Sequence, residues 1–220
     1  MAGAFISFEG IDGSGKSTQL RMLASVLRLR GLDVVSTREP GGTPLGQQLR
    51  HALLEAESQV DPLAELLLYA ADRAQHVRTL VGPALVAGHV VLSDRFADAT
   101  VAYQGAGRGF EPGVVSSVID LATGGLRPDL TLLFDLTVAQ AKGRAKERTR
   151  HGRPTDRLEA EDETFHERVR ECYLRIAADE SARVRVVEAD RSSEEIHARV
   201  LEIVMPFLEI RSQRSEAGGQ

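Results

Sequence analysis

The sequence predicts an α/β fold in which a parallel five-stranded sheet is doubly wound and flanked by helices, with a helical lid. A short apolar run at 5–8 is followed by a glycine-rich turn and then by a helical pattern, the order of a βα unit. Four further apolar runs, at 33–37, 89–94, 130–135 and 184–187, alternate with segments of helical periodicity. Such alternation is typical of a parallel sheet that is covered on both faces.

Composition excludes several classes of protein. The formal net charge of −5 argues against general nucleic-acid binding, so we expect no nucleic-acid partner. Cys172 is the only cysteine, which rules out an internal disulfide and favours a reducing, cytoplasmic location. No apolar run reaches the ~18 residues that a membrane span needs, so we expect no membrane contact.

The turn after the first apolar run has the spacing Gly-x-x-x-x-Gly-Lys-Ser from Gly10 to Ser17, the phosphate-binding P-loop pattern. Glycines let backbone N–H groups curl around an oxyanion, and Lys16 adds a positive charge for terminal phosphates. The Ser17 hydroxyl is a natural Mg²⁺ ligand, and the following helix directs its positive end at the same phosphates. A chance glycine-rich turn is the alternative, but the strand before it and the helix after it favour a nucleoside-triphosphate site.

The second strand leads into Arg38 and a turn stiffened by Pro40. Because ligands of open α/β sheets bind beyond the carboxyl ends of strands, Arg38 is a binding candidate; a surface ion pair is the alternative. Thr43 should then cap a helix that has Pro44 in its first turn.

Asp61 and Pro62 predict the start of a long helix. Its predicted apolar face consists of Leu63, Leu66, Leu67, Ala70 and Ala74. Tyr69 and Arg73 are four residues apart and should share a side of this helix, offering a stacking surface and a fork of donors. A core position for Tyr69 is an equally good interpretation.

The strand at 89–94 ends in Asp94, followed by Arg95. An acid in this position is what a P-loop enzyme uses to reach the Mg²⁺ shell, whereas a helix-capping Asp is the alternative. Thr100, Tyr103 and Gln104 come next, and we expect a flexible glycine-rich segment at 105–109.

A basic segment at about 142–158 differs from the rest of the chain. Its cations are Lys142, Arg144, Lys146, Arg148, Arg150, Arg153 and Arg157. A charge run is ordinarily a solvated face, but the Gly152/Pro154 break in a P-loop protein favours a lid that closes arginines over phosphates. Helices should follow at 159–178 and from Ser192 to Leu208.

Over nearly its whole length the chain resembles the bacterial thymidylate kinases. The resemblance rests on Phe-Glu-Gly-Ile-Asp-Gly-Ser-Gly-Lys-Ser-Thr at 8–18, Thr-Arg-Glu-Pro-Gly-Gly-Thr at 37–43, Ala-Asp-Arg at 71–73, Ser-Asp-Arg-Phe at 93–96, Ala-Tyr-Gln-Gly at 102–105 and Arg-Pro-Asp-Leu-Thr at 127–131. It implies one P-loop kinase domain at 1–210 with a flexible tail at 211–220, a homodimer, and transfer of a phosphoryl group from Mg-ATP to dTMP. ATP would be bound by Gly10, Ile11, Asp12, Gly13, Ser14, Gly15, Lys16, Ser17 and Thr18, and Mg²⁺ by Ser17 and Asp94.

The resemblance also assigns the acceptor site. The residues implied in dTMP binding are Asp12, Arg38, Tyr69, Arg73, Arg95, Thr100, Tyr103 and Gln104. Arg38 and Arg95 would hold the 5′-phosphate, and Asp12 would accept a hydrogen bond from the 3′-hydroxyl. Tyr103 would crowd the 2′ position, while Tyr69, where the family commonly has Phe, would stack on thymine. Arg73 would read a ring carbonyl, and Thr100 and Gln104 would complete the pocket.

The catalytic cations implied are Lys16, Arg95 and a lid arginine. Some thymidylate kinases carry Arg directly after the P-loop acid, but this chain has Gly13 there, so the lid should supply the extra charge. Arg153 is the first choice because it lies at the break, with Arg148, Arg150 and Arg157 as further candidates. A weaker match at Ala189-Asp190-Arg191 is similar to the adenine-contacting loop of the family.

Two alternative functions remain open at this point. A kinase for another nucleotide or for a deoxynucleoside would share the P-loop, but a nucleoside kinase needs a carboxylate base, and the arginines favour an anionic acceptor. A GTPase-like switch usually selects guanine with Asn-Lys-x-Asp, and this chain contains no Asn.

Overall fold

The computed structural model describes residues 3–54, 59–150 and 156–217. Five parallel strands form one sheet in the order β2-β3-β1-β4-β5, with β1 at the centre; β2 and β3 lie on one side of it and β4 and β5 on the other. The strands are β1 Ala4–Glu9, β2 Val34–Arg38, β3 Val90–Asp94, β4 Leu130–Asp135 and β5 Val184–Glu188. Each begins and ends within one residue of the expected range. The predicted doubly wound fold class is confirmed.

The central strand β1 is buried along its whole length, which explains its continuous apolar sequence. Phe8 stacks on Phe134 of β4 with ring centroids 5.7 Å apart. The one hydroxyl on β1, that of Ser7, is paired with the Thr131 hydroxyl at 2.7 Å and so is not left without a hydrogen bond. This packing holds the carboxyl end of β1, where the P-loop begins, in a fixed position.

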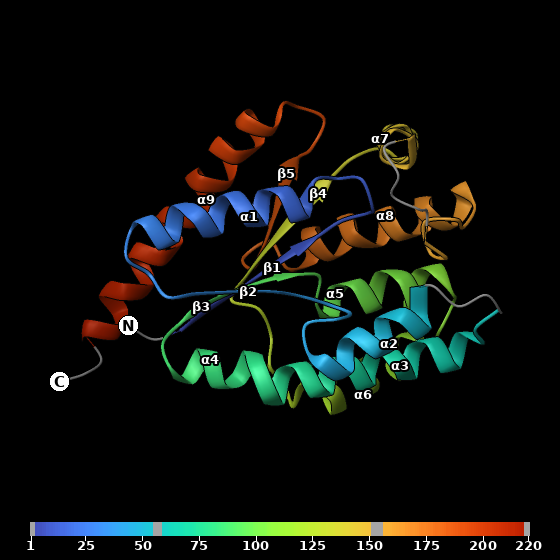
Figure 1. Cartoon of the computed structure of the whole chain (residues 1–220), viewed down its shortest axis with the longest axis horizontal. Coiled ribbons are helices and arrows are strands. Elements are labelled where there is room, and N and C mark those ends of the chain that lie inside the picture. Colours follow the sequence, from blue (N-terminus) through green and yellow to red (C-terminus); the bar gives the residue numbers. More distant parts are fainter. Residues whose placement is uncertain (1–2, 55–58, 151–155, 218–220) are drawn as a thin grey trace.

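Helices cover both faces of the sheet (Figure 1). Their bounds are α1 Lys16–Leu29, α2 Pro44–Leu54, α3 Pro62–His76, η1 Val77–Val81, α4 Gly82–Val86, α5 Ala97–Thr100, η2 Val101–Gly107, α6 Pro112–Thr123, α7 Val138–Arg150, α8 Glu163–Asp179 and α9 Ser193–Ala217, η1 and η2 being π-helical. α1 and α9 pack together on one face, and α4 and α8 pack on the other. The carboxyl ends of the strands open toward α2, α3, η2 and α7, and these elements surround the site.

The long helix α3 starts where predicted, because Asp61 caps it by accepting hydrogen bonds from the N–H groups of Leu63 and Ala64. The predicted apolar face of α3 is only partly correct, since Leu66 is the one predicted leucine that is fully buried. Leu63 and Leu67 are half exposed, whereas the side that packs inward carries Tyr69 and Arg73 together with further polar residues. Hydrophobicity misidentified part of this face because α3 buries its polar residues in a hydrogen-bonded site and leaves leucines at the surface.

The glycine-rich segment expected to be flexible is instead largely helical. Gly105 and Gly107 belong to η2, which continues directly from α5. Gly107 packs so closely on α8 that a Cβ there would overlap the ring of Phe165. Glycine therefore serves close packing here rather than mobility.

The last helix continues past its expected end at Leu208 to Ala217. Arg211 lies within it and donates to the Gly3 carbonyl at 2.9 Å and to Asp129 at 2.7 Å. The tail expected from residue 211 therefore begins inside a helix. In the described part of the chain, no helix has the length and apolar character to cross a membrane.

Candidate active site

The loop between β1 and α1 has the backbone geometry of a phosphate cradle. Gly10, Gly13 and Gly15 adopt positive φ angles of 130°, 90° and 93°, which glycine reaches without strain. A Cβ on Gly10 would also overlap the carbonyl oxygen of Phe134. Because α1 begins at Lys16, the loop amides and the positive end of the helix face the same space.

Lys16 turns back into this loop. Its ammonium group donates to the carbonyls of Gly10 and Ile11 at 3.0 and 2.9 Å. Burial, together with the nearby positive charge of Arg95, lowers the pKa of Lys16 to about 8, although Asp12 and Asp94 act in the opposite direction. The group is therefore mostly charged near neutral pH and is positioned for an anion in the loop.

Ser17 and Asp94, the two predicted metal ligands, lie together. The Ser17 hydroxyl donates a hydrogen bond to the Asp94 carboxylate across the carboxyl ends of β1 and β3. Oxygen donors of this kind suit Mg²⁺, which keeps several waters and takes few protein ligands. Among the described residues there is no group of three or more His, Cys, Asp or Glu side chains arranged around a metal position, so other oxygens would have to complete the shell.

Arg95 follows β3 directly and reaches across the end of β1. It is a non-glycine residue with a positive φ, 73°, an uncommon conformation that is often found at functional sites. Its guanidinium donates to Asp12 at 2.8 Å, to the Gly10 carbonyl at 3.0 Å and to the Tyr103 hydroxyl at 3.1 Å. Tyr103 also donates to Asp12 at 3.2 Å. Three residues predicted for the acceptor site thus form one contact network.

Glu9, which the sequence did not indicate as a site residue, supports this network through Tyr173. Its carboxyl group is fully buried and accepts from the Phe96 N–H at 2.7 Å and from the Tyr173 hydroxyl at 2.8 Å. Tyr173 in turn accepts from Arg95 at 3.2 Å. Burial, reinforced by the charge of Asp98, raises the pKa of Glu9 to about 8. A glutamate at the end of a strand gives no sign in the sequence that it is buried or that its pKa is raised. The burial of Glu9 depends on α8, which contributes Tyr173.

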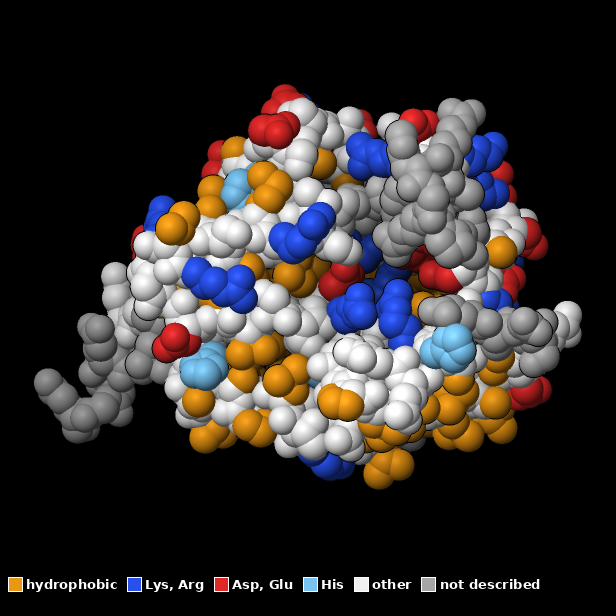
Figure 2. Space-filling model, viewed as in Figure 1, with side chains coloured by type: hydrophobic (Ala, Val, Ile, Leu, Met, Phe, Trp, Pro, Cys, Tyr) orange, Lys and Arg blue, Asp and Glu red, His pale blue; other side chains and the backbone are white. Residues whose placement is uncertain are grey.

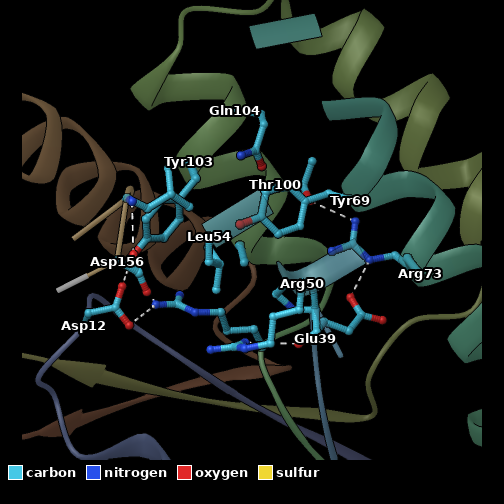
Figure 3. Close-up of a pocket in the computed structure, with 14 residues that line it drawn as sticks. Asp12, Glu39, Arg50, Leu54, Tyr69, Arg73, Thr100, Tyr103, Gln104 and Asp156 are labelled. Carbon is cyan, nitrogen blue, oxygen red and sulfur yellow. Dashed lines mark hydrogen bonds and ion pairs between the residues drawn. The ribbon is translucent and has the colours of Figure 1, made fainter. Parts of the chain in front are cut away.

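A pocket of about 560 Å³ adjoins Arg95. It is lined by every predicted acceptor residue except Arg38, namely Asp12, Tyr69, Arg73, Arg95, Thr100, Tyr103 and Gln104. Figure 3 shows these side chains converging from the P-loop, from α3 and from the α5–η2 segment. Tyr69 is buried but faces this space, so it is not a core residue remote from the site. Burial raises its pKa above the usual value, so the phenol stays neutral.

Arg73 is the most tightly held residue of the pocket. Its guanidinium donates to Glu39 at 2.8 Å, to Thr100 at 2.8 Å and to the Phe96 carbonyl at 3.0 Å. Glu39 uses its second oxygen for His76 at 2.7 Å. A buried arginine paired in this way is fixed in orientation before any ligand arrives.

Other lining residues were not found from the sequence. They are Glu39, Pro40, Arg50, Ala99, Leu54, Asp156 and Leu158. Glu39 follows Arg38 in a predicted loop, where the sequence suggests at most a surface ion pair and gives no sign that the Glu39 side chain is buried. Arg50 and Leu54 come from α2, and Asp156 from the carboxyl-terminal end of the lid segment, so only the tertiary fold brings them together. The local sequence does not distinguish a charged helix residue that lines a pocket, such as Arg50, from one that is exposed to solvent.

A larger cleft, of about 1830 Å³ and open to solvent, lies over the P-loop. It shares Asp12 and Arg95 with the smaller pocket. Figure 2 shows Lys and Arg side chains gathered around the hollow between α1 and α2. The arginines that line it are Arg21, Arg38, Arg50, Arg95, Arg144 and Arg191. Arg38 is exposed at the end of β2 and opens to this cleft rather than to the smaller pocket. Arg191, from the weaker sequence match, also lines it.

The lid arginines divide into three groups. Arg153 lies outside the described residues, as do the side chains of Arg148 and Arg150. Arg157 does not line the cleft but donates to Glu65 at 2.5 Å and to the Leu53 carbonyl at 3.0 Å, so it is the wrong candidate for the phosphate region. Arg144 of α7, not singled out from the sequence, lies at the loop and donates to the Gly13 carbonyl at 3.4 Å.

Comparisons with known proteins agree with this arrangement. The family model for thymidylate kinase matches residues 8–200. The chain is similar to a thymidylate kinase of Halothermothrix orenii, 50% identical over 91% of this chain and 95% of that protein, and to one of Nitratidesulfovibrio vulgaris, 52% identical over 93% of each. The crystal structure of thymidylate kinase from Ehrlichia chaffeensis superposes with a TM-score of 0.75, at 32% identity, covering 93% of this chain and 100% of that one. The family model covers most of the chain and the relatives match nearly all of it, so this protein belongs to the thymidylate kinase family.

Proposed function

We propose that this chain transfers the γ-phosphoryl group of ATP to the 5′-phosphate of dTMP, giving dTDP for dTTP synthesis. One observation supports the assignment of donor and acceptor to these two spaces. The P-loop cleft and the smaller pocket share a wall that contains Asp12 and Arg95. A donor in the cleft and an acceptor in the pocket would therefore meet at the Arg95 guanidinium.

The donor half consists of residues 10–18. Backbone N–H groups from Gly10 to Thr18 and the ammonium of Lys16 bind the phosphates of ATP, while Arg144 and Arg191 lie at the open end of the cleft. Ser17 and Asp94 would hold Mg²⁺. When bound, the ion would supply positive charge to offset the charge of the phosphates.

The acceptor half consists of the pocket residues together with Arg38, which lines the adjoining cleft. Tyr69 stacks on the thymine ring, and Arg73 donates to a ring carbonyl while Glu39 and Thr100 hold its orientation. Tyr103 occupies the space beside the sugar and excludes a 2′-hydroxyl. Asp12, next to it, accepts a hydrogen bond from the 3′-hydroxyl.

The chemistry needs alignment and charge stabilisation rather than a strong base. The acceptor phosphate is already anionic near neutral pH, so no hydroxyl has to be deprotonated. Lys16 and Arg95 are fixed by hydrogen bonds and neutralise the charge that develops between donor and acceptor oxygens. A lid arginine, with Arg153 as the first choice, supplies the remaining charge.

We further propose that the enzyme is a cytoplasmic homodimer. Leu63 and Leu67 of α3 are exposed, and so are Val114 and Leu121 of α6, which packs beside α3. Figure 2 shows hydrophobic side chains along the lower edge of the molecule, over α3. Exposed leucines on two adjacent helices favour contact with a second copy. A Leu63→Glu/Leu67→Glu variant should be monomeric by light scattering, whereas Leu29→Glu, on the exposed side of α1, should leave the dimer intact.

The substrate assignment is tested by an ADP-release assay with ATP and a panel of acceptors: dTMP, dUMP, dCMP, dGMP, UMP and thymidine. We expect dTMP to give the highest kcat/KM and thymidine to give none. A preference for another monophosphate, or turnover of thymidine, would contradict the proposal.

A further inference from the structure

Glu65 of α3 is a buried carboxylate that nothing in the proposed reaction uses. It is fully buried, yet donors from three other segments converge on it. Gln104 donates its amide nitrogen to Oε1 at 2.9 Å. Arg108 donates to both oxygens, at 3.2 and 3.1 Å, and Arg157 donates to Oε2 at 2.5 Å. One carboxylate on α3 thereby joins η2, which carries Gln104, to Arg157 at the carboxyl-terminal end of the lid segment.

The two arginines keep this carboxylate ionised. Burial alone would raise the pKa of Glu65, but the hydrogen bonds from Arg108, Gln104 and Arg157 outweigh it, and the pKa lies below its usual value. An ionised carboxylate can only accept hydrogen bonds. Glu65 must therefore take the NH₂ end of the Gln104 amide and cannot take its oxygen.

This constraint determines which end of Gln104 faces the ligand pocket. Gln104 is almost completely buried and lines the pocket, so its amide has no freely solvated alternative position. With the nitrogen bonded to Glu65, the oxygen lies on the pocket side, as Figure 3 shows. Arg73 lines the same pocket, which therefore presents both a hydrogen-bond acceptor from Gln104 and donors from Arg73.

A pocket that offers one hydrogen-bond acceptor and one donor to the base is complementary to one class of pyrimidine. Thymine and uracil carry a ring N–H next to a carbonyl oxygen, which complement an acceptor and a donor respectively. Cytosine has an unprotonated ring nitrogen and an amino group at these positions, so it would set acceptor against acceptor and donor against donor. A buried site built for one pattern rejects the other strongly, because its polar groups are left unpaired.

We propose that Glu65 is a positioning residue that fixes the orientation of the Gln104 amide, and through it the preference of the pocket for a pyrimidine with a ring N–H over cytosine. The inference rests on the proposed function, since it requires a pyrimidine monophosphate in this pocket. Glu65 does not touch the ligand itself.

The test compares Glu65→Gln with a matched control. A glutamine at position 65 can offer either an oxygen or an NH₂ group to Gln104, so the orientation of that amide is no longer enforced. We expect the ratio of kcat/KM for dTMP to that for dCMP to fall by roughly tenfold or more, with most of the change in the KM for dTMP and little change in the KM for ATP. Glu161→Gln removes the other carboxylate partner of Arg108, at 2.7 Å, without touching Gln104, and should keep the wild-type ratio.

A merely structural role for Glu65 predicts a different result, in which stability falls and the dTMP-to-dCMP ratio does not. An unchanged ratio in a folded Glu65→Gln protein would overturn the inference. If that variant does not fold, neutron diffraction of the wild-type enzyme with dTMP locates the amide hydrogens of Gln104 directly. Hydrogens directed at Glu65 support the inference, and hydrogens directed at the base overturn it. Absence of dTMP turnover in the wild type would instead reject the proposed function.

Discussion

Arg95 and Asp12 form an ion pair of 2.8 Å on the wall shared by the P-loop cleft and the smaller pocket. Both side chains are partly exposed to these spaces, so the pair is accessible to ligands on either side. An incoming phosphate offers Arg95 better-matched oxygens, and a sugar hydroxyl can replace the bond that Asp12 receives. The pair therefore holds the arginine in place before substrates arrive and can exchange partners when they do.

Replacing Lys16 tests the donor site. Lys16→Ala removes the ammonium that is positioned against the P-loop, and we expect kcat to fall by roughly 10²-fold or more. Because the side chain bonds only to loop groups, circular dichroism should show an intact fold. Arg199→Ala, at an exposed arginine of α9 paired with Glu202, is the control and should affect kcat little. Near-normal turnover in Lys16→Ala would remove the P-loop from the mechanism.

Arg73 should contribute to both binding and stability. The sequence predicts a loss of about 1–3 kcal/mol in base recognition when its fork is lost, affecting dTMP more than ATP. The structure adds a second effect, because Glu39 would remain buried with one partner fewer. Arg73→Lys keeps the charge but not the fork, so we expect weaker dTMP binding by calorimetry at a smaller cost in thermal stability than in Arg73→Ala. Equal weakening of ATP and dTMP binding would show that the assignment of this pocket to dTMP is wrong.

Tyr103 allows its ring and its hydroxyl to be tested separately. Tyr103→Ala opens the space beside the sugar and should raise turnover of ribonucleotide acceptors relative to dTMP. Tyr103→Phe keeps the ring but loses the bonds to Asp12 and Arg95. We expect it to exclude ribonucleotides as the wild type does while lowering kcat. If Tyr103→Ala keeps the wild-type preference, another group excludes the 2′-hydroxyl.

The raised pKa of Glu9 predicts that the stability of the fold depends on pH. Its pKa is about 8 in the folded protein and 4.5 for a free glutamate side chain, so between these values folding takes up a proton. The contribution of Glu9 is fully present below pH 4.5 and is lost as the pH rises through 8, at up to about 1.4 kcal/mol per pH unit.

The measurement is the free energy of unfolding by urea at pH 6.5, 7.0 and 7.5, for wild type and Glu9→Gln. We expect the wild type to lose stability relative to Glu9→Gln as the pH rises. This range lies above the pKa of Asp72, about 6, and below that of Lys16, about 8, so neither group dominates the slope. A constant difference between the two proteins would mean that Glu9 is already ionised in the fold.

The lid arginine should act mainly in the transition state. We expect Arg153→Ala to lower kcat by roughly 10³-fold while changing the KM for dTMP much less. The sequence also predicts that Arg at Gly13 should restore part of the rate. The structure argues against that rescue, because Gly13 has a φ of 90° and a Cβ there would lie 2.9 Å from the Ala141 carbonyl of α7. Arg144→Ala serves as a comparison, and full activity in every lid variant would contradict the assignment.

The sequence by itself determined the fold class and the P-loop. Both depend on local information: apolar runs of strand length, glycine at positions of positive φ, and Lys16 at the start of a helix. The resemblance between short motifs then identified most of the pocket, because the motifs that supply the lining residues lie at the carboxyl ends of strands or on facing helices. Residues at these places meet whatever the details of packing, since parallel strands end at one edge.

Tertiary structure decided what those residues are bonded to. It buried Glu9 beneath Arg95, paired Arg73 with Glu39, and turned Arg157 toward Glu65 and away from the phosphate region. It also buried Leu66 of α3 but left Leu63 and Leu67, two other members of the expected apolar face, at the surface. Burial and ion pairing depend on side chains that are far apart in the chain. A local pattern shows that a residue is charged or apolar, but only the packed fold fixes which partner compensates that charge and which surface covers that apolar group.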